Sequence, residues 1–137
     1  MGQDEAVMDY QELTEKIIGA AYTVHNRMGY GFLESVYEKC LLIELAEAGL
    51  FCQAQAPLAV HYNDAVVGNF VADIVVEETV IVELKSVTKL VTAHEVQLVN
   101  YLTATGLPIG LLLNFGESRV EVKRKVKDLC SQSNSTS

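Results

Sequence analysis

The chain has 137 residues, of which 50% are hydrophobic and 20% are charged, a balance that excludes a disordered polypeptide. Its net charge of −8 disfavours broad electrostatic attraction to nucleic acid, although a site built from carboxylates would itself add negative charge. No apolar run is long enough to span a membrane, and we expect no secretory signal in the acidic N-terminus. We expect one domain, residues 9–127, between a flexible N-terminal arm, 1–8, and a polar disordered tail, 128–137.

The three cysteines are Cys40, Cys52 and Cys130. They are too scattered for a zinc knuckle and odd in number for a set of disulfides. We therefore expect free thiols and a cytoplasmic protein.

Two helices are predicted at the start of the domain. Asp9 and Glu12 have the spacing of a capping box, and apolar side chains then recur at helical spacing until Gly29. A second helix is predicted from Leu33 to Ala48, with Gly49 as its stop.

Three strands are predicted next. Pro57 comes before a strand from Leu58 to Tyr62. After an Asn-Asp turn, a second strand runs from Val66 to Val76, with Gly68 as the site of a bulge. The third strand runs from Val80 to Lys85.

A helix and two strands complete the domain. Thr92 and Glu95 have the spacing of a capping box that opens a helix, and Gly106 ends this helix. The apolar run from Ile109 to Phe115 is typical of a strand buried on both faces, and residues from Arg119 to Lys123 alternate as an outer strand.

This order of elements predicts an α/β fold with a mixed sheet flanked by helices. Because a helix connects them, the strands 80–85 and 109–115 are expected to be parallel neighbours.

Charged residues interrupt two of the apolar strands. Asp73 lies in one, and Glu83 and Lys85 end the next. A charge inside such a strand costs several kcal/mol (about 2–7 for a polar group) unless it is paired or binds something. The simpler interpretation is that these are ordinary solvated charges at strand ends, and the more specific interpretation is that they form a functional site.

The turn between the two strands decides whether these charges meet. Glu83 and Lys85 are two residues apart and share one face of their strand. A two-residue turn at Glu77-Glu78 would place Asp73 opposite Val82, on the wrong face. For these charged side chains to converge, the loop must have an odd number of residues, such as residues 77–79, or the hairpin must contain a bulge. We predict one of these.

Converging carboxylates would form a site for Mg²⁺ or Mn²⁺, which prefer oxygen ligands. The expected ligands are Asp73, Glu83 and the backbone carbonyl of Leu84, with Glu34 of the second helix as a third carboxylate. Lys85 would orient or activate the attacking water.

The helix from Thr92 adds two further candidates. Gln97 and Tyr101 are four residues apart and share a helix face. Gln97 would position substrate or water, and Tyr101 would contact the phosphate or brace the site. Tyr37, in contrast, is expected to pack in the core.

Three signatures occur in order along the chain. Gly31, Glu34 and Tyr37 match GxxExxY; Asp73 with Glu83-Leu84-Lys85 matches D…(D/E)xK; Gln97 and Tyr101 match the QxxxY of RecB-type nucleases. Together they resemble the GxxExxY family of the PD-(D/E)XK nuclease superfamily, over about residues 13–125. One departure is that Ala72 stands where the superfamily name has proline.

The resemblance implies a restriction-endonuclease-like fold and a metal-dependent nuclease that hydrolyses phosphodiester bonds. It implies that Glu34, Asp73 and Glu83 bind metal, that Lys85 is the catalytic lysine and that Gln97 and Tyr101 support catalysis. Its substrate would be nucleic acid, DNA before RNA, with a homodimer or protein partner helping so small and acidic a domain to bind it. The alternative is a catalytically silent module with the same fold, which binds a protein partner or nucleic acid.

Overall fold

The computed structural model describes residues 9–127. The predicted arm 1–8, the predicted tail 128–137 and Cys130 lie outside the described residues. The described cysteines, Cys40 and Cys52, are free thiols, as expected.

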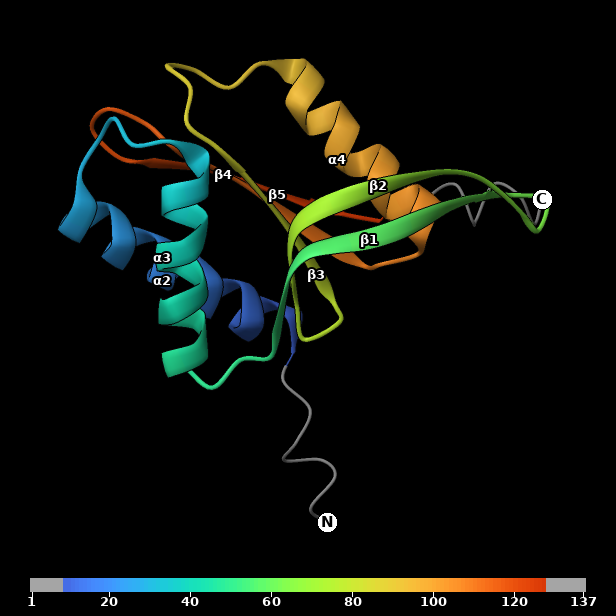
Figure 1. The fold of residues 1–137 in the computed structure, drawn as a ribbon, viewed down its shortest axis with the longest axis horizontal. Helices are drawn as coiled ribbons and strands as arrows, with labels where there is room; N and C mark the ends of the chain where they lie inside the picture. Colours follow the sequence, from blue (N-terminus) through green and yellow to red (C-terminus); the bar gives the residue numbers. More distant parts are fainter. Residues whose placement is uncertain (1–8, 128–137) are drawn as a thin grey trace, which may run out of the picture.

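A mixed sheet forms the centre of the molecule (Figure 1). Its strands follow one another across the sheet in chain order, β1 (Cys52–Tyr62), β2 (Ala65–Val76), β3 (Val80–Lys85), β4 (Ile109–Phe115) and β5 (Val120–Val126). Strands β3 and β4 are parallel and the other neighbours are antiparallel, which confirms the predicted crossover. The predicted fold class, an α/β sheet flanked by helices in a single domain, is confirmed.

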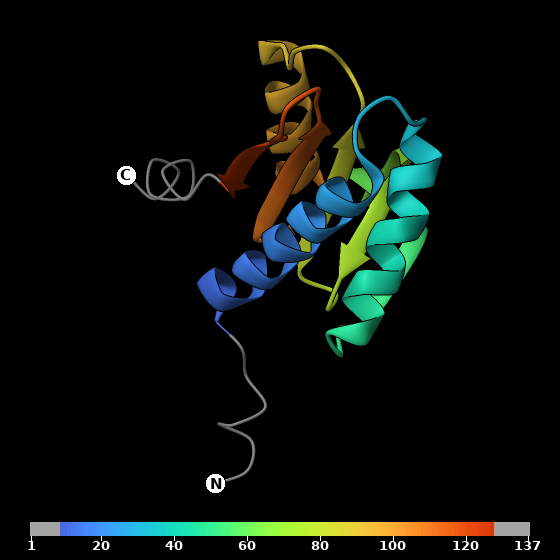
Figure 2. The same ribbon diagram turned by 90° about the vertical axis from the view of Figure 1, so that its left-hand side faces the viewer.

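Helices cover both faces of the sheet (Figure 2). One face packs against α2 (Tyr10–Met28) and α3 (Glu34–Glu47), and the other packs against α4 (Thr92–Thr105). Val80, Val82 and Leu84 of β3 point into the α2/α3 layer, whereas Ile81 points toward α4. By the same alternation Glu83 lies on the α4 side. None of α2, α3 and α4 has the length and apolar content needed to cross a membrane.

The alternation of faces breaks where β2 reaches Asp73. Ala72 and Val75 both belong to the α4-side core, whereas Ile74 belongs to the α2/α3-side core. Regular alternation would put Ala72 and Ile74 on the same side, so the strand turns over at Asp73. Opposite it, Gln55 of β1 has a left-handed φ of 50°, and the β1–β2 pairing skips both residues. Asp73 therefore lies at an irregularity of the sheet, between the two helical layers.

Strand β1 begins earlier than expected, and this prediction was wrong. Pro57 lies inside β1 and pairs with Val71, instead of preceding the strand. Proline is tolerated here because β1 is an edge strand, whose outward N–H groups need no partner. The predicted bulge at Gly68 is one residue away: Val60 pairs with Gly68 and His61 with Val66.

The start of α4 also differs from the prediction. Its N-cap is Val91, not Thr92, and the ring nitrogen Nδ1 of His94 accepts the Val91 N–H at 3.3 Å. Glu95 is unavailable for capping because its carboxylate binds Lys125 of β5 at 2.7 Å. At the start of α2, in contrast, Asp9 accepts the Glu12 N–H at 2.7 Å, as expected.

The close approach of α4 to β4 depends on Gly110. A Cβ atom at this buried position would lie 2.7 Å from Cδ1 of Leu98, so Gly110→Ala must displace the helix or this leucine. We expect the variant to lower the free energy of unfolding by about 1–3 kcal/mol in urea titrations. The matched control is Gly19→Ala on the exposed side of α2, where nothing lies within 4 Å of the added methyl group. It should gain about 0.5–1 kcal/mol. Equal stability of the two variants would contradict this account of the packing.

Candidate functional site

The hairpin between β2 and β3 has the odd loop that convergence requires. Ile74 pairs with Val82 and Val76 with Val80, which leaves residues 77–79 as a three-residue loop. The predicted odd loop is therefore confirmed, and extending this register by one pair places Asp73 opposite Glu83.

Crossed hydrogen bonds join the two acidic residues. The Asp73 N–H donates to Oε2 of Glu83 at 3.1 Å, and the Leu84 N–H donates to Oδ2 of Asp73 at 2.8 Å. The regular backbone pairing of β2 with β3 ends just before, at Ile74 and Val82. The carboxylates thus replace backbone carbonyls as acceptors where the strands diverge, which offsets the cost of placing them there.

Glu83 lies in an environment that opposes its charge. Burial, and next the Asp73 carboxylate, raise the pKa of Glu83 from 4.5 to about 7, against the Asp73 N–H and Lys85, which lower it. The charge of Glu34 raises this pKa further. Lys85 and Glu34 therefore both lie within electrostatic reach of Glu83. A bound cation would favour the ionised form of this carboxylate.

Tyr101 closes the α4 side of the site. Its ring stacks on Phe70 of β2, with centroids 3.6 Å apart and an interplanar angle of 10°. Burial and the charge of Glu83 raise the pKa of the Tyr101 phenol. Gln97, one turn earlier on the same helix, is exposed. Tyr101 is thus held near Glu83, and Gln97 faces solvent beyond it.

Two polar residues near Asp73 escaped the sequence analysis. Nε2 of Gln55 donates to both carboxylate oxygens of Glu38, at 2.9 and 3.1 Å. Burial is the largest cause that raises the pKa of Glu38, and the charges of Asp73 and Glu34 raise it further. Glu38 lies one helical turn after Glu34, so the helical spacing could have identified it. Gln55 could not be found, because the start of β1 was missed.

Tyr37 fixes the loop that precedes Glu34. It is fully buried, as expected, and its hydroxyl donates to the Gly29 carbonyl at 2.6 Å and accepts the Phe32 N–H at 3.2 Å. Ser86, the residue after Lys85, donates to the Phe32 carbonyl at 2.9 Å. These bonds attach the loop before α3 to the end of β3, which is how Glu34 comes near Glu83.

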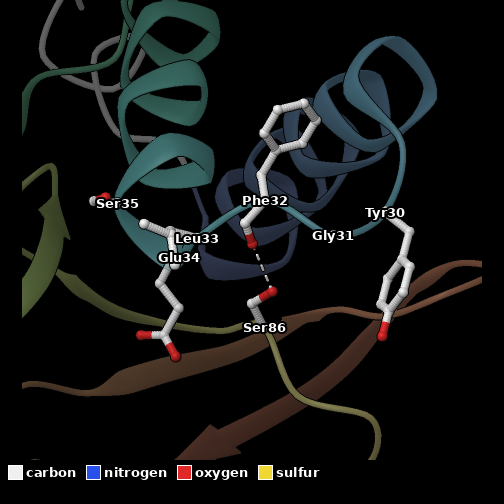
Figure 3. Close-up of a pocket in the computed structure, with 7 residues that line it drawn as sticks. All are labelled: Tyr30, Gly31, Phe32, Leu33, Glu34, Ser35 and Ser86. Carbon is white, nitrogen blue, oxygen red and sulfur yellow. Dashed lines mark hydrogen bonds between the residues drawn. The ribbon is translucent and has the colours of Figure 1, made fainter.

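An open pocket of about 560 Å³ lies beside this junction (Figure 3). It is lined by one short loop segment and one residue of the β3 exit, namely Tyr30, Gly31, Phe32, Leu33, Glu34, Ser35 and Ser86. Figure 3 shows Tyr30 and Glu34 extending to the same side of the loop, on either side of Ser86.

The residues fit a hard divalent cation by the kind of donor they offer. Asp73, Glu83 and Glu34 supply carboxylate oxygens, which Mg²⁺ and Mn²⁺ prefer. Within residues 9–127, no three His, Cys, Asp or Glu side chains form a ready-made metal cluster. One oxygen each of Asp73 and Glu83 accepts a backbone N–H. Metal binding would therefore require rotation of these side chains.

Comparison with known proteins assigns the family. The model of the PD-(D/E)XK nuclease superfamily matches residues 11–125, and the chain belongs to this superfamily. No curated protein matches the sequence.

Solved structures give a similar fold at low identity. The structure of SSO0001 matches at 14% identity and a TM-score of 0.54, over 71% of this chain and 52% of that one. This chain thus spans about half the length of SSO0001, and the likeness shows the fold alone. An alkaline exonuclease from Laribacter hongkongensis matches at 12% identity and a TM-score of 0.48, over 88% of this chain and 86% of that one.

The raised pKa of Glu83 predicts how stability depends on pH without divalent metal. The folded state binds this proton more tightly than the unfolded state, so the free energy of unfolding falls as pH rises from 4.5 to about 7. Glu83→Gln removes this term while keeping an acceptor for the Asp73 N–H. In urea titrations with EDTA, we expect the free energy of unfolding of the variant to exceed that of the wild type by about 2–3 kcal/mol near pH 8. The two proteins should be equally stable near pH 4.

The control for this measurement is Glu47→Gln, at an exposed position of α3. It should follow the wild-type pH profile. A constant difference between wild type and Glu83→Gln at every pH would show that Glu83 titrates normally.

Proposed function

We propose that the protein is a metal-dependent nuclease that hydrolyses phosphodiester bonds, and that it belongs to the GxxExxY group of its superfamily. One observation carries the proposal: Asp73 and Glu83 oppose each other at the diverging ends of β2 and β3 in a chain of a nuclease superfamily. The hydrogen bonds of Tyr37 give the GxxExxY spacing a physical reason, because they hold the loop that precedes Glu34.

Each residue of the candidate site has a proposed role. Asp73, Glu83, Glu34 and the backbone carbonyl of Leu84 would hold Mg²⁺ or Mn²⁺. When bound, the metal would polarise the scissile phosphodiester and lower the pKa of a bound water. Lys85, on the same strand face as Glu83, would orient the attacking water and offset charge on the phosphate.

Gln97 and Tyr101 would act on the substrate side of the site. The stacked ring of Tyr101 is held against Phe70, which supports a bracing role or a contact of its hydroxyl with the phosphate. Gln97 is exposed and free to position substrate or water. Their common helix face supports a shared function.

The substrate proposed is nucleic acid, with DNA before RNA. The net charge of −8 supports help from a homodimer or protein partner in binding it. Four basic residues cluster near the C-terminus, namely Lys123, Arg124, Lys125 and Lys127. They contribute less to substrate binding than their number suggests, because Lys125 is already paired with Glu95. The cytoplasmic location stays a prediction, supported by the free thiols Cys40 and Cys52.

The second candidate function is a catalytically silent module that binds a protein or nucleic acid. Two observations favour it: the acidic balance of the chain, and the backbone hydrogen bonds that already engage Asp73 and Glu83. Metal binding separates it from the nuclease.

Cleavage is the first test. Labelled single- and double-stranded DNA and RNA are incubated with Mg²⁺ or Mn²⁺, and Lys85→Ala is compared with wild type. We expect metal-dependent cleavage by the wild type and a loss of about 10²–10⁴-fold in the variant, because the lysine acts on the water and phosphate. Lys16→Ala, at an exposed position of α2, is the control and should cleave normally. Absence of cleavage by the wild type on all four substrates would favour the silent module.

Metal binding can be measured without cleavage. We expect Mn²⁺ at about a hundred times its Kd to stabilise the wild type by about 2.7 kcal/mol, seen as a rise in Tm. Asp73→Asn should abolish most of this rise because it removes a charged ligand. Asp64→Asn, in the exposed β1–β2 turn, keeps a residue that tolerates the left-handed φ of 69° there and should respond like the wild type. An unchanged response of Asp73→Asn would contradict the proposed ligand set.

A further inference from the structure

The pocket beside Glu34 has features that the proposed chemistry does not use. Its volume of about 560 Å³ lies in the range of small-molecule sites. Tyr30 is 50% exposed, and its ring extends to the same side of the loop as Glu34, with Ser86 between them (Figure 3). An exposed tyrosine at the wall of a preformed pocket presents a flat surface of low conformational entropy.

The charge of the pocket selects what can enter. None of its lining residues is basic, and Glu34 contributes a carboxylate. A phosphate group would be repelled here, whereas a neutral planar group can stack on an aromatic ring. A nucleobase meets both conditions.

The loop that carries Tyr30 is fixed before any ligand binds. Gly29 and Gly31 have φ values of 77° and 108°, which side-chain-bearing residues rarely adopt. The buried hydroxyl of Tyr37 bonds to the Gly29 carbonyl and the Phe32 N–H, and Ser86 donates to the Phe32 carbonyl. The loop therefore loses little conformational entropy when a ligand binds.

The pocket is adjacent to the candidate site. Glu34 lines the pocket and is also one of the proposed metal ligands. Ser86 lines it too and directly follows Lys85. A nucleotide whose phosphate lies at Glu83 and Lys85 would thus have its base, or that of its neighbour, at the pocket.

We propose that this pocket binds an unpaired base of the substrate strand, with the ring of Tyr30 as the stacking surface. The inference rests on the proposed nuclease function and names its substrate class: single-stranded nucleic acid, or a duplex with a frayed or overhanging end. A base inside a duplex has both faces covered by its neighbours and could enter only after unstacking.

Binding is measured by fluorescence anisotropy with labelled 12-nucleotide DNA and RNA probes, single-stranded and as blunt duplexes. Mg²⁺ is present, and all proteins carry Lys85→Ala, which keeps every proposed metal ligand and slows cleavage of the probes. We expect single strands to bind at least about tenfold more tightly than duplexes. Adding Tyr30→Ala should weaken single-strand binding by about tenfold, the effect of one lost stacked base, and Tyr30→Phe should restore it.

Two controls isolate the stacking. Tyr62→Ala removes a tyrosine that is 69% exposed beside the β1–β2 turn, on the far side of the molecule from α3 (Figure 1), and should leave binding unchanged. A probe made of abasic nucleotides keeps the phosphates but lacks the bases. With this probe Tyr30→Ala should have no effect, because the difference between the two probes measures contact with the base.

The outcomes separate this inference from the proposed function. If duplexes bind as well as single strands, or if Tyr30→Ala weakens both probes equally, the base pocket is wrong, whether or not the wild type cleaves. If binding depends on Tyr30 and on the bases but the wild type never cleaves, the pocket stands and the nuclease activity fails.

Discussion

The crossed hydrogen bonds between Asp73 and the end of β3 are the contact on which the candidate site depends. Where two strands diverge, their last N–H groups need new acceptors, and here the acceptors are carboxylates. The Asp73 carboxylate accepts the Leu84 N–H, and the Glu83 carboxylate accepts the Asp73 N–H. Each acid is oriented by the backbone of the opposite strand. The sheet therefore fixes the acids through main-chain geometry, which tolerates exchange of the surrounding apolar residues better than side-chain packing would.

The irregularity at Asp73 extends this arrangement to both helical layers. A regular strand would present Asp73 to one face only. Because the strand turns over there, the charge of Asp73 acts on Glu38 of α3 as well as on Glu83, which faces the α4 side. The left-handed backbone of Gln55 lies opposite, and its side chain holds Glu38. The site is thus assembled from three strands and two helices at a place where the sheet is irregular.

The sequence predicted the parts that follow periodicity and failed where tertiary contacts decide. The apolar runs gave the strands β3 and β4 and their parallel pairing, and the geometry of opposed residues required the three-residue loop before Val80. The start of β1 was missed because it holds little apolar alternation and contains Pro57. The capping box of Thr92 and Glu95 was predicted in place of the N-cap at Val91, because the sequence does not show that Glu95 pairs with Lys125. Gln55 has no local signal that identifies it as a neighbour of Asp73, whereas Glu38 could have been identified by its helical spacing from Glu34.

The electrostatics of the candidate site would oppose the binding of a nucleic acid substrate. Burial and neighbouring acids raise the pKa of Glu83 and of Glu38, so these residues hold negative charge only at a cost in folding free energy. The same charge repels a phosphate backbone, and a divalent cation would relieve both effects at once. Phosphate contacts then become favourable only after the cation binds. A neutral base on Tyr30 would need no such compensation, because stacking is insensitive to the sign of the surrounding charge. Contact with bases is therefore the form of nucleic acid binding that a chain of net charge −8 could offer without a bound cation.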